Sequence, residues 1–304
     1  MKNFKDCVHF KNTSLKDYCT FKIGGYAKHL FVVYSSNALI EVCRFLQQKN
    51  INFKVIGLGA NLLFSDRGYD GAIIVNQSAS IMFRKNTVYV GSGTNFGELI
   101  FCCRKKGLSG IECLAGIPST VGGALVNNLG AFNTTFENCV EWIEGFYLSN
   151  LNKKIRLHKN DCCFGYRTSI FKQGNFIITK AKLRLNYDNP LNISLKIRQC
   201  LTAKHQSQPV NLPSAGSIFK RCEIIPAKVI DELGLKGLTV GGAQISTKHA
   251  GFIVNTNNAS ASNVRSLIST IKAKVKAATN VNLPLELEIL PYKNKILKPK
   301  IIDL

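Results

Sequence analysis

The chain has 304 residues, of which 45% are hydrophobic, and its 40 Lys and Arg residues against 18 Asp and Glu residues give a formal net charge of +22. This apolar content is too high for a disordered polycation, and no apolar run reaches the roughly 18 residues of a membrane span. The length indicates about two domains. The charge leaves two explanations open: a polyanionic partner such as nucleic acid, or a lysine-rich solvated surface without a function of its own.

The first hundred residues alternate short strands with helical segments. Strand-like runs occur at 29–34, 53–56, 72–75 and 87–90. Helical spacing places Leu39, Val42, Cys43 and Leu46 on one face, and then Phe96, Leu99, Ile100 and Cys103 on another, which ends at Gly107. Strands alternating with helices indicate an α/β arrangement.

Residues 107–131 are rich in glycine, yet small and apolar residues dominate them. A flexible linker would be polar and rich in serine, so we expect this segment to be buried. Strands are predicted again at 140–146 and 176–185.

Pro190 opens a helical connector at 190–205, where we place the domain boundary. Beyond it we predict a loop and a strand at 206–221, a short helix at 226–233 that stops at Gly234, and a strand at 252–255. We expect Ser262 to cap an amphipathic helix with Val264, Leu267, Ile268, Ile271 and Val275 on its apolar face. A strand at 285–290 and a basic tail at 291–304 follow.

The N-terminus and the cysteines indicate a reducing compartment. No apolar signal-peptide core is present, so we expect a cytoplasmic protein. The 11 cysteines form no CxxC motif, and the 5 histidines show no zinc-like spacing. We therefore expect reduced structural cysteines and no metal site.

Two glycine loops are candidates for ligand binding. The first, Gly57-Leu58-Gly59-Ala60-Asn61, lacks the third glycine of a dinucleotide fingerprint and by itself is typical of an ordinary tight turn. The second runs from Gly116 to Ala124, where backbone amides can approach an anion without obstruction by side chains. Together the two loops indicate a large ligand with a diphosphate, although close-packed turns without a ligand are an alternative.

Three polar positions lie in apolar surroundings. Arg167, between aromatic residues, is either a surface stack or a guanidinium placed for a carboxylate or phosphate. Ser217 is either a strand serine or a functional hydroxyl, and no nucleophile-elbow pattern surrounds it. Glu286 and Glu288 share one face of the predicted strand, as a solvent-facing edge or as an active-site feature.

Seven motifs in a characteristic order make the chain recognisable. They are NTSLKDYCTFKIGG at 12–25, GLGANLLFSDRGYDG at 57–71, GLSGIECLAGIPSTVGGALVNNLGAF at 107–132, FGYRTSIF at 164–171, PSAGSIFK at 213–220, GLKGLTVGGAQISTKHAGFIVN at 234–255 and LELEI at 285–289. From about Asn12 to Leu290 the chain resembles the UDP-N-acetylenolpyruvoylglucosamine reductases, the MurB family of flavoenzymes, in the form without a tyrosine-loop insertion.

This resemblance implies an α+β fold. A two-lobed FAD-binding domain of the vanillyl-alcohol-oxidase/PCMH type would cover 1–190, with lobes at about 1–75 and 76–190. A connector at 191–205 would lead to a smaller α/β domain at 206–304 that binds the UDP-sugar. The residues implied for FAD are Gly57, Gly59, Ala60, Asn61, Leu62, Gly116, Ile117, Pro118, Ser119, Thr120, Gly122, Gly123, Asn127, Gly130 and Ala131.

The resemblance also implies the chemistry. NADPH would reduce FAD, and flavin N5 would then deliver a hydride to the enolpyruvyl sugar. Arg167 and a protonated Glu288, whose pKa the apolar neighbours Leu287 and Ile289 would raise, would stabilise the enolate, and Ser217 would donate the proton. The remaining implied substrate contacts are Tyr166, Lys220, Lys248 and His249.

Some positions depart from the family pattern. Ala60 replaces a serine, Ser119 replaces a glycine and could strain a turn that favours positive φ, and Arg221-Cys222 replaces Asn-Pro. We expect an FAD enzyme that acts as a monomer on small molecules, without nucleic-acid or membrane partners. The alternatives are another PCMH-type flavin oxidoreductase and a basic nucleic-acid-binding protein.

Overall fold

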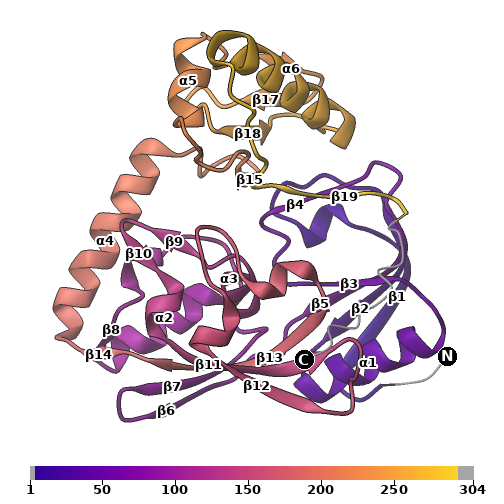
Figure 1. Ribbon diagram of the computed structural model, residues 1–304, viewed down its shortest axis with the longest axis vertical. Coiled ribbons are helices and arrows are strands. Elements are labelled where there is room, and N and C mark those ends of the chain that lie inside the picture. The colour runs from indigo at the N-terminus through magenta and orange to yellow at the C-terminus, as the bar shows by residue number, and fades with distance from the viewer. Residues whose placement is uncertain (1–3, 294–304) are drawn as a thin grey trace.

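The computed structural model describes residues 4–293 (Figure 1). Within this range the chain forms six α-helices, three sheets of four or five strands and several two-stranded pairings. The helices pack against one mixed sheet and two antiparallel sheets, and this combination confirms the α+β class. Most of the predicted basic tail, residues 294–304, lies outside the described residues. No helix within 4–293 is long and apolar enough to cross a membrane.

The first lobe is a four-stranded sheet with the order β1-β2-β5-β3. Its strands are β1 (Cys7–Ser14), β2 (Tyr26–Val33), β3 (Phe53–Ile56) and β5 (Tyr69–Asn76). β2, β5 and β3 run parallel, and β1 joins them antiparallel. Helix α1 (Ser36–Gln48) buries the predicted face of Leu39, Val42, Cys43 and Leu46 against this sheet. The alternation predicted here is confirmed, with β1 as an additional strand.

The second lobe is a five-stranded antiparallel sheet with the order β12-β11-β13-β7-β6. Its strands are β6 (Ile81–Arg84), β7 (Thr87–Gly91), β11 (Val140–Tyr147), β12 (Lys154–His158) and β13 (Phe176–Arg184). Helices α2 (Phe96–Lys105) and α3 (Val121–Val126) share its core. The predicted helix after residue 95 and the burial of much of the 107–131 segment are confirmed. Two short pairings complete the lobe: β8 (Leu108–Ser109) with β14 (Asn186–Tyr187), and β9 (Gly130–Ala131) with β10 (Thr134–Thr135).

Helix α4 (Pro190–Ser207) leads from the second lobe to the C-terminal part, as Figure 1 shows. There a sheet with the order β15-β18-β17-β16 packs with two helices. The elements are β15 (Ser214–Ser217), α5 (Pro226–Glu232), β16 (Thr239–Val240), β17 (Ala243–Ile245), β18 (Phe252–Asn255) and α6 (Ala261–Thr279). The predicted apolar face of α6 is buried.

The cap of α6 differs from the prediction. Ser260, not Ser262, is the N-cap, since its hydroxyl accepts a hydrogen bond from the amide of Asn263 at 3.0 Å. Ser262 lies inside the first turn, where its amide donates to the carboxylate of Asp66 at 2.9 Å. The same carboxylate accepts from the amide of Ala261, which ties the helix to the first lobe.

The end of the chain returns to the first lobe. Strand β19 (Glu288–Leu290) is shorter than the predicted 285–290 strand, and it pairs in parallel with β4 (Leu62–Phe64) (Figure 1). One hydrophobic core consequently contains Phe64 of the first lobe together with Val264 and Leu287. This return brings residues 285–288 beside the first glycine loop.

Candidate active site

A cavity of about 1080 Å³ is lined by both lobes and by the C-terminal part. Its wall contains the two glycine loops, the end of α4, β15 and the 285–288 segment. Every residue that the resemblance assigned to FAD lines it: Gly57, Gly59, Ala60, Asn61, Leu62, Gly116, Ile117, Pro118, Ser119, Thr120, Gly122, Gly123, Asn127, Gly130 and Ala131. The sequence-predicted loops, 59 residues apart when counted from Gly57 to Gly116, therefore face one space.

The two glycine loops also touch each other. A Cβ atom on Gly57 would lie 2.9 Å from Cγ2 of Thr120 and closer still to its hydroxyl oxygen. Gly59 has a φ of +62°, and a Cβ there would meet the Cα atom of Cys19 at 2.8 Å. Both glycines are thus required for close backbone approach, because a side chain at either position would collide with a neighbouring segment of the chain.

The expected strain at Ser119 is not found. Among the described residues, Ser119 is absent from those with positive φ, and its hydroxyl donates to the carbonyl of Thr120 at 2.9 Å. The left-handed position of this loop is Gly116, with a φ of +75°. Helix α3 after the loop has only six residues, so it has no long helix dipole. The backbone amides of the loop are therefore the groups that can bind an anion.

Arg167 lies at the corner of a tight turn. The backbone groups of Gly165 and Thr168 bond each other reciprocally at 3.1 and 3.2 Å, and the Asn128 side chain donates to the Gly165 carbonyl at 3.0 Å. Arg167 itself has a φ of +55°, an unusual conformation for a residue with a Cβ atom. Such strain is concentrated at functional sites, where surrounding contacts maintain it.

The carboxylate next to Arg167 belongs to Glu286. Oε1 of Glu286 lies 2.7 Å from Nε of Arg167, and the two side chains are only 17% and 23% exposed. The Nε–H is not aligned for a hydrogen bond, which leaves this buried nitrogen without a hydrogen-bond partner. Burial raises the pKa of Glu286 above its usual range, and the nearby charge of Arg167 offsets part of that rise.

Glu288 lines the same cavity but has a different environment. Its side chain is 45% exposed and pairs with Nζ of Lys54. The desolvated environment expected for Glu288 is therefore found at Glu286. The physical reason is that β19 begins at Glu288, in contact with the first lobe, whereas Glu286 precedes it and faces the interior.

Ser217 ends β15 and also lines the cavity. The amide of the next residue, Ile218, donates to the carbonyl of Gly251 at 2.9 Å, and the carbonyl of Ile218 accepts from the amide of Glu286 at 2.9 Å. Ser217 is thus held on the backbone that also holds Glu286. Its hydroxyl makes no hydrogen bond within residues 4–293 and can serve a ligand.

Two lysines add positive charge on the side of Arg167. Lys172 and the predicted Lys220 both line the cavity. Burial, followed by the nearby charge of Lys220, lowers the pKa of Lys172. The charges of Glu286 and Glu288 oppose this shift. The cationic side chains and the two carboxylates therefore lie close together in this part of the cavity. Lys172 carries no motif of its own in the sequence and was not predicted.

The other predicted substrate contacts do not line the cavity. Tyr166 is 59% exposed, and its hydroxyl accepts from the amide of Arg221 at 3.4 Å. Nζ of Lys248 bonds the carbonyl of His205, and the ring of His249 accepts from the amide of Gly251 at 3.1 Å. The structure therefore places Lys220 in the cavity wall, whereas Tyr166, Lys248 and His249 do not line the cavity.

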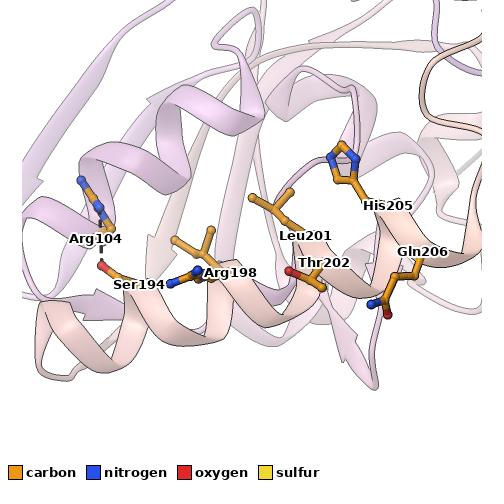
Figure 2. A pocket seen from close by; sticks show the side chains of 8 residues that line it. Arg104, Ser194, Arg198, Leu201, Thr202, His205 and Gln206 are labelled. Atoms are coloured by element: carbon orange, nitrogen blue, oxygen red, sulfur yellow. Dashed lines mark hydrogen bonds between the residues drawn. The ribbon is translucent and has the colours of Figure 1, made fainter.

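A smaller hollow of about 420 Å³ lies between α2 and α4 (Figure 2). Arg104, Arg198 and His205 contribute to it, and Nη1 of Arg104 bonds the hydroxyl of Ser194 at 3.5 Å. It contains no predicted site residue. No group of three potential metal ligands occurs within residues 4–293.

The fold and the cavity have the features of an FAD-binding oxidoreductase. A family model described as an FAD binding domain matches residues 27–150, and one described as the C-terminal domain of UDP-N-acetylenolpyruvoylglucosamine reductase matches residues 208–290. Both matched ranges contribute to the cavity wall: the first contains the two glycine loops, and the second contains Ser217 and the 285–288 segment.

Relatives match almost the whole chain. It is 38% identical over 288 residues to the UDP-N-acetylenolpyruvoylglucosamine reductase of Fervidobacterium nodosum, covering 93% of this chain and 92% of the relative. The identity to the enzyme of that name from Chlamydia abortus is 39%, with 92% and 93% covered. The crystal structure of UDP-N-acetylenolpyruvylglucosamine reductase from Thermus caldophilus superimposes with a TM-score of 0.79 at 31% identity, covering 94% of this chain and 99% of that one. The chain belongs to the UDP-N-acetylenolpyruvoylglucosamine reductase family, and it is an FAD-containing oxidoreductase.

Proposed function

We propose that the chain reduces UDP-N-acetylenolpyruvoylglucosamine to UDP-N-acetylmuramate with electrons from NADPH. The observation that carries this proposal is the convergence of the two glycine loops, Arg167, Ser217 and both glutamates on one cavity. When bound, FAD supplies hydride-transfer chemistry that amino-acid side chains lack. The two loops whose glycines line the cavity, and the largely buried guanidinium of Arg167, fit a large polar cofactor and its substrate.

The chain's own residues would then have separate tasks. Arg167 balances the negative charge that develops next to the substrate carboxylate, and its partly buried position strengthens this interaction. Ser217 donates a proton to the carbon that becomes the new stereocentre, and its hydroxyl has no competing partner in the described residues. Glu288 faces the substrate, while Lys172 and Lys220 attract its diphosphate.

Several finer features belong to the same proposal. Residues 1–190 form the FAD-binding domain, and 206–304 form the substrate domain, with α4 between them. Tyr166 closes the outer edge of the site, and the enzyme works in the cytoplasm as a monomer without a nucleic-acid partner. Lys248 and His249 could reach the substrate only if their present backbone hydrogen bonds broke.

The test is a spectroscopic and kinetic experiment with purified protein. We expect the visible absorption of bound flavin, its bleaching by NADPH, and its return after addition of the enolpyruvyl sugar. Protein that takes up no FAD would refute the cofactor assignment. Protein that NADPH bleaches but the sugar does not restore would indicate another flavin oxidoreductase.

A further inference from the structure

Lys204 on α4 is a buried cation that the proposed reaction does not use. It is only 4% exposed, yet it lines the large cavity. A buried ammonium group normally pairs with a carboxylate. Lys204 forms no ion pair with the described residues, and its Nζ donates to the backbone carbonyl of Ala115. An ammonium group has three donors, so this site has unused binding capacity.

Its location relates Lys204 to the second glycine loop. Ala115, its hydrogen-bond partner, directly precedes Gly116, and a Cβ atom on Gly116 would lie 3.8 Å from Cδ of Lys204. The ring of Phe132 lies 5.7 Å from Nζ and provides a weakly polar wall. The lysine is therefore held behind the loop that is expected to hold the cofactor.

The surroundings of Lys204 disfavour its charge. Burial lowers the pKa of Lys204 to about 8, and the titratable neighbours Cys200 and Cys113, on α4 and on the turn before Ala115, only partly oppose this shift. Burial raises the pKa of the Cys200 thiol to about 11. A protein that maintains an uncompensated cation at the wall of a cavity accepts a stability cost there. A bound anion would remove that cost.

We propose that Lys204 is the counter-ion of the FAD diphosphate. This inference rests on the proposed binding of FAD and adds a residue to it. Of the diphosphates that enter the cavity, FAD is favoured because the charges of Lys172 and Lys220 gather beside Arg167, where the substrate would bind. Lys204 contacts the glycine loop instead.

The experiment compares three variants of the full chain after removal of FAD. Lys204→Met keeps the length of the side chain without its charge, Lys204→Arg keeps the charge, and Lys196→Met is the matched control on the same helix. Lys196 pairs with Asp188 at 3.1 Å and with the buried carboxylate of Glu112 at 3.4 Å, so it is a lysine whose charge is already compensated, and it does not line the cavity. Flavin fluorescence measures the affinity for FAD and for riboflavin, which has no phosphate.

We expect Lys204→Met to weaken FAD binding by about 10- to 100-fold, the range for a hydrogen bond to a charged group. Riboflavin binding should stay unchanged, and Lys204→Arg and Lys196→Met should bind FAD nearly as the parent does. The melting temperature of the FAD-free protein should rise in Lys204→Met, because a buried unpaired charge is removed.

Each opposite result overturns the inference. Equal loss of FAD and riboflavin, or a lowered melting temperature, would assign Lys204 a purely structural role. Unchanged FAD affinity with a raised KM for the UDP-sugar would assign it to the substrate diphosphate. If the parent itself takes up no FAD, the proposed function fails first, and the two failures are thereby distinguished.

Discussion

The ion pair between Glu286 and Arg167 gives the sharpest prediction about the reaction. We expect Glu286→Gln to slow transfer to the enolpyruvyl sugar by about 10- to 100-fold. Only 17% and 23% of the two side chains are exposed, and 2.7 Å separates Nε from Oε1. With glutamine, the guanidinium loses the charge that holds it, and a displacement of about 1 Å at a catalytic group costs up to about 100-fold in rate.

The stability of this variant should move in the other direction. Burial raises the pKa of Glu286, so the folded state favours its protonated form. The stability from that protonated form is fully present below the pKa of an unfolded glutamate and is lost as pH rises through the folded pKa. Near pH 7 the wild-type carboxylate therefore carries a cost that a neutral glutamine lacks. We expect a melting temperature equal to or above that of the parent.

Stopped-flow measurement of the two half-reactions separates these effects. Reduction of the enzyme by NADPH should proceed at the parental rate, while its reoxidation by the enolpyruvyl sugar slows. Glu144→Gln is the matched control: its carboxylate is 16% exposed, pairs with Arg156 at 3.1 Å and does not line the cavity. Parental reoxidation by Glu286→Gln, or equal slowing of both half-reactions, would refute a positioning role for Glu286.

Three further variants test other parts of the site and the fold. Gly57→Ala should weaken FAD binding at least about 10-fold in a fluorescence titration, because its Cβ would collide with Thr120 and force the loops apart. Ser217→Ala should slow reoxidation by the enolpyruvyl sugar by about 100-fold or more, with NADPH reduction intact, as expected for loss of a proton donor; a parental rate would exclude that role. Asp66→Ala should lower the free energy of unfolding in urea by about 1–2 kcal/mol, since its carboxylate accepts from two amides at the start of α6; an unchanged midpoint and slope would contradict this.

Local sequence signals predicted the elements whose causes are local. Helical spacing identified the apolar faces of α1 and α6, and both faces are buried. Glycine content identified both loops, because close backbone approach excludes side chains whatever the surrounding fold. At α6 the predicted cap, Ser262, was wrong: the carboxylate of Asp66 from the first lobe accepts from its amide, and the hydroxyl of Ser260 caps the helix instead.

The distinction between the two glutamates illustrates what the sequence could not specify. Residues 286 and 288 are two apart and share one face of an extended segment, so any periodicity treats them alike. Their environments differ because Asn61 holds this segment: its side chain donates to the carbonyl of Glu286, and its carbonyl accepts from the amide of Glu288, both at 3.0 Å. That register joins residues more than 220 positions apart in the chain.

The charge of +22 can be apportioned on the same structural basis. Of the cations that line the cavity, Arg167 and Lys54 already pair with carboxylates. Lys172, Lys204 and Lys220 also line it and form no ion pair with the described residues. Three uncompensated lysines in one concave site are a sufficient source of attraction for diphosphate ligands, and they account for only a small share of the excess. The total charge is thus a poor guide to the ligand, whereas a position in the cavity wall without a carboxylate partner identifies the individual lysines that are available to a ligand.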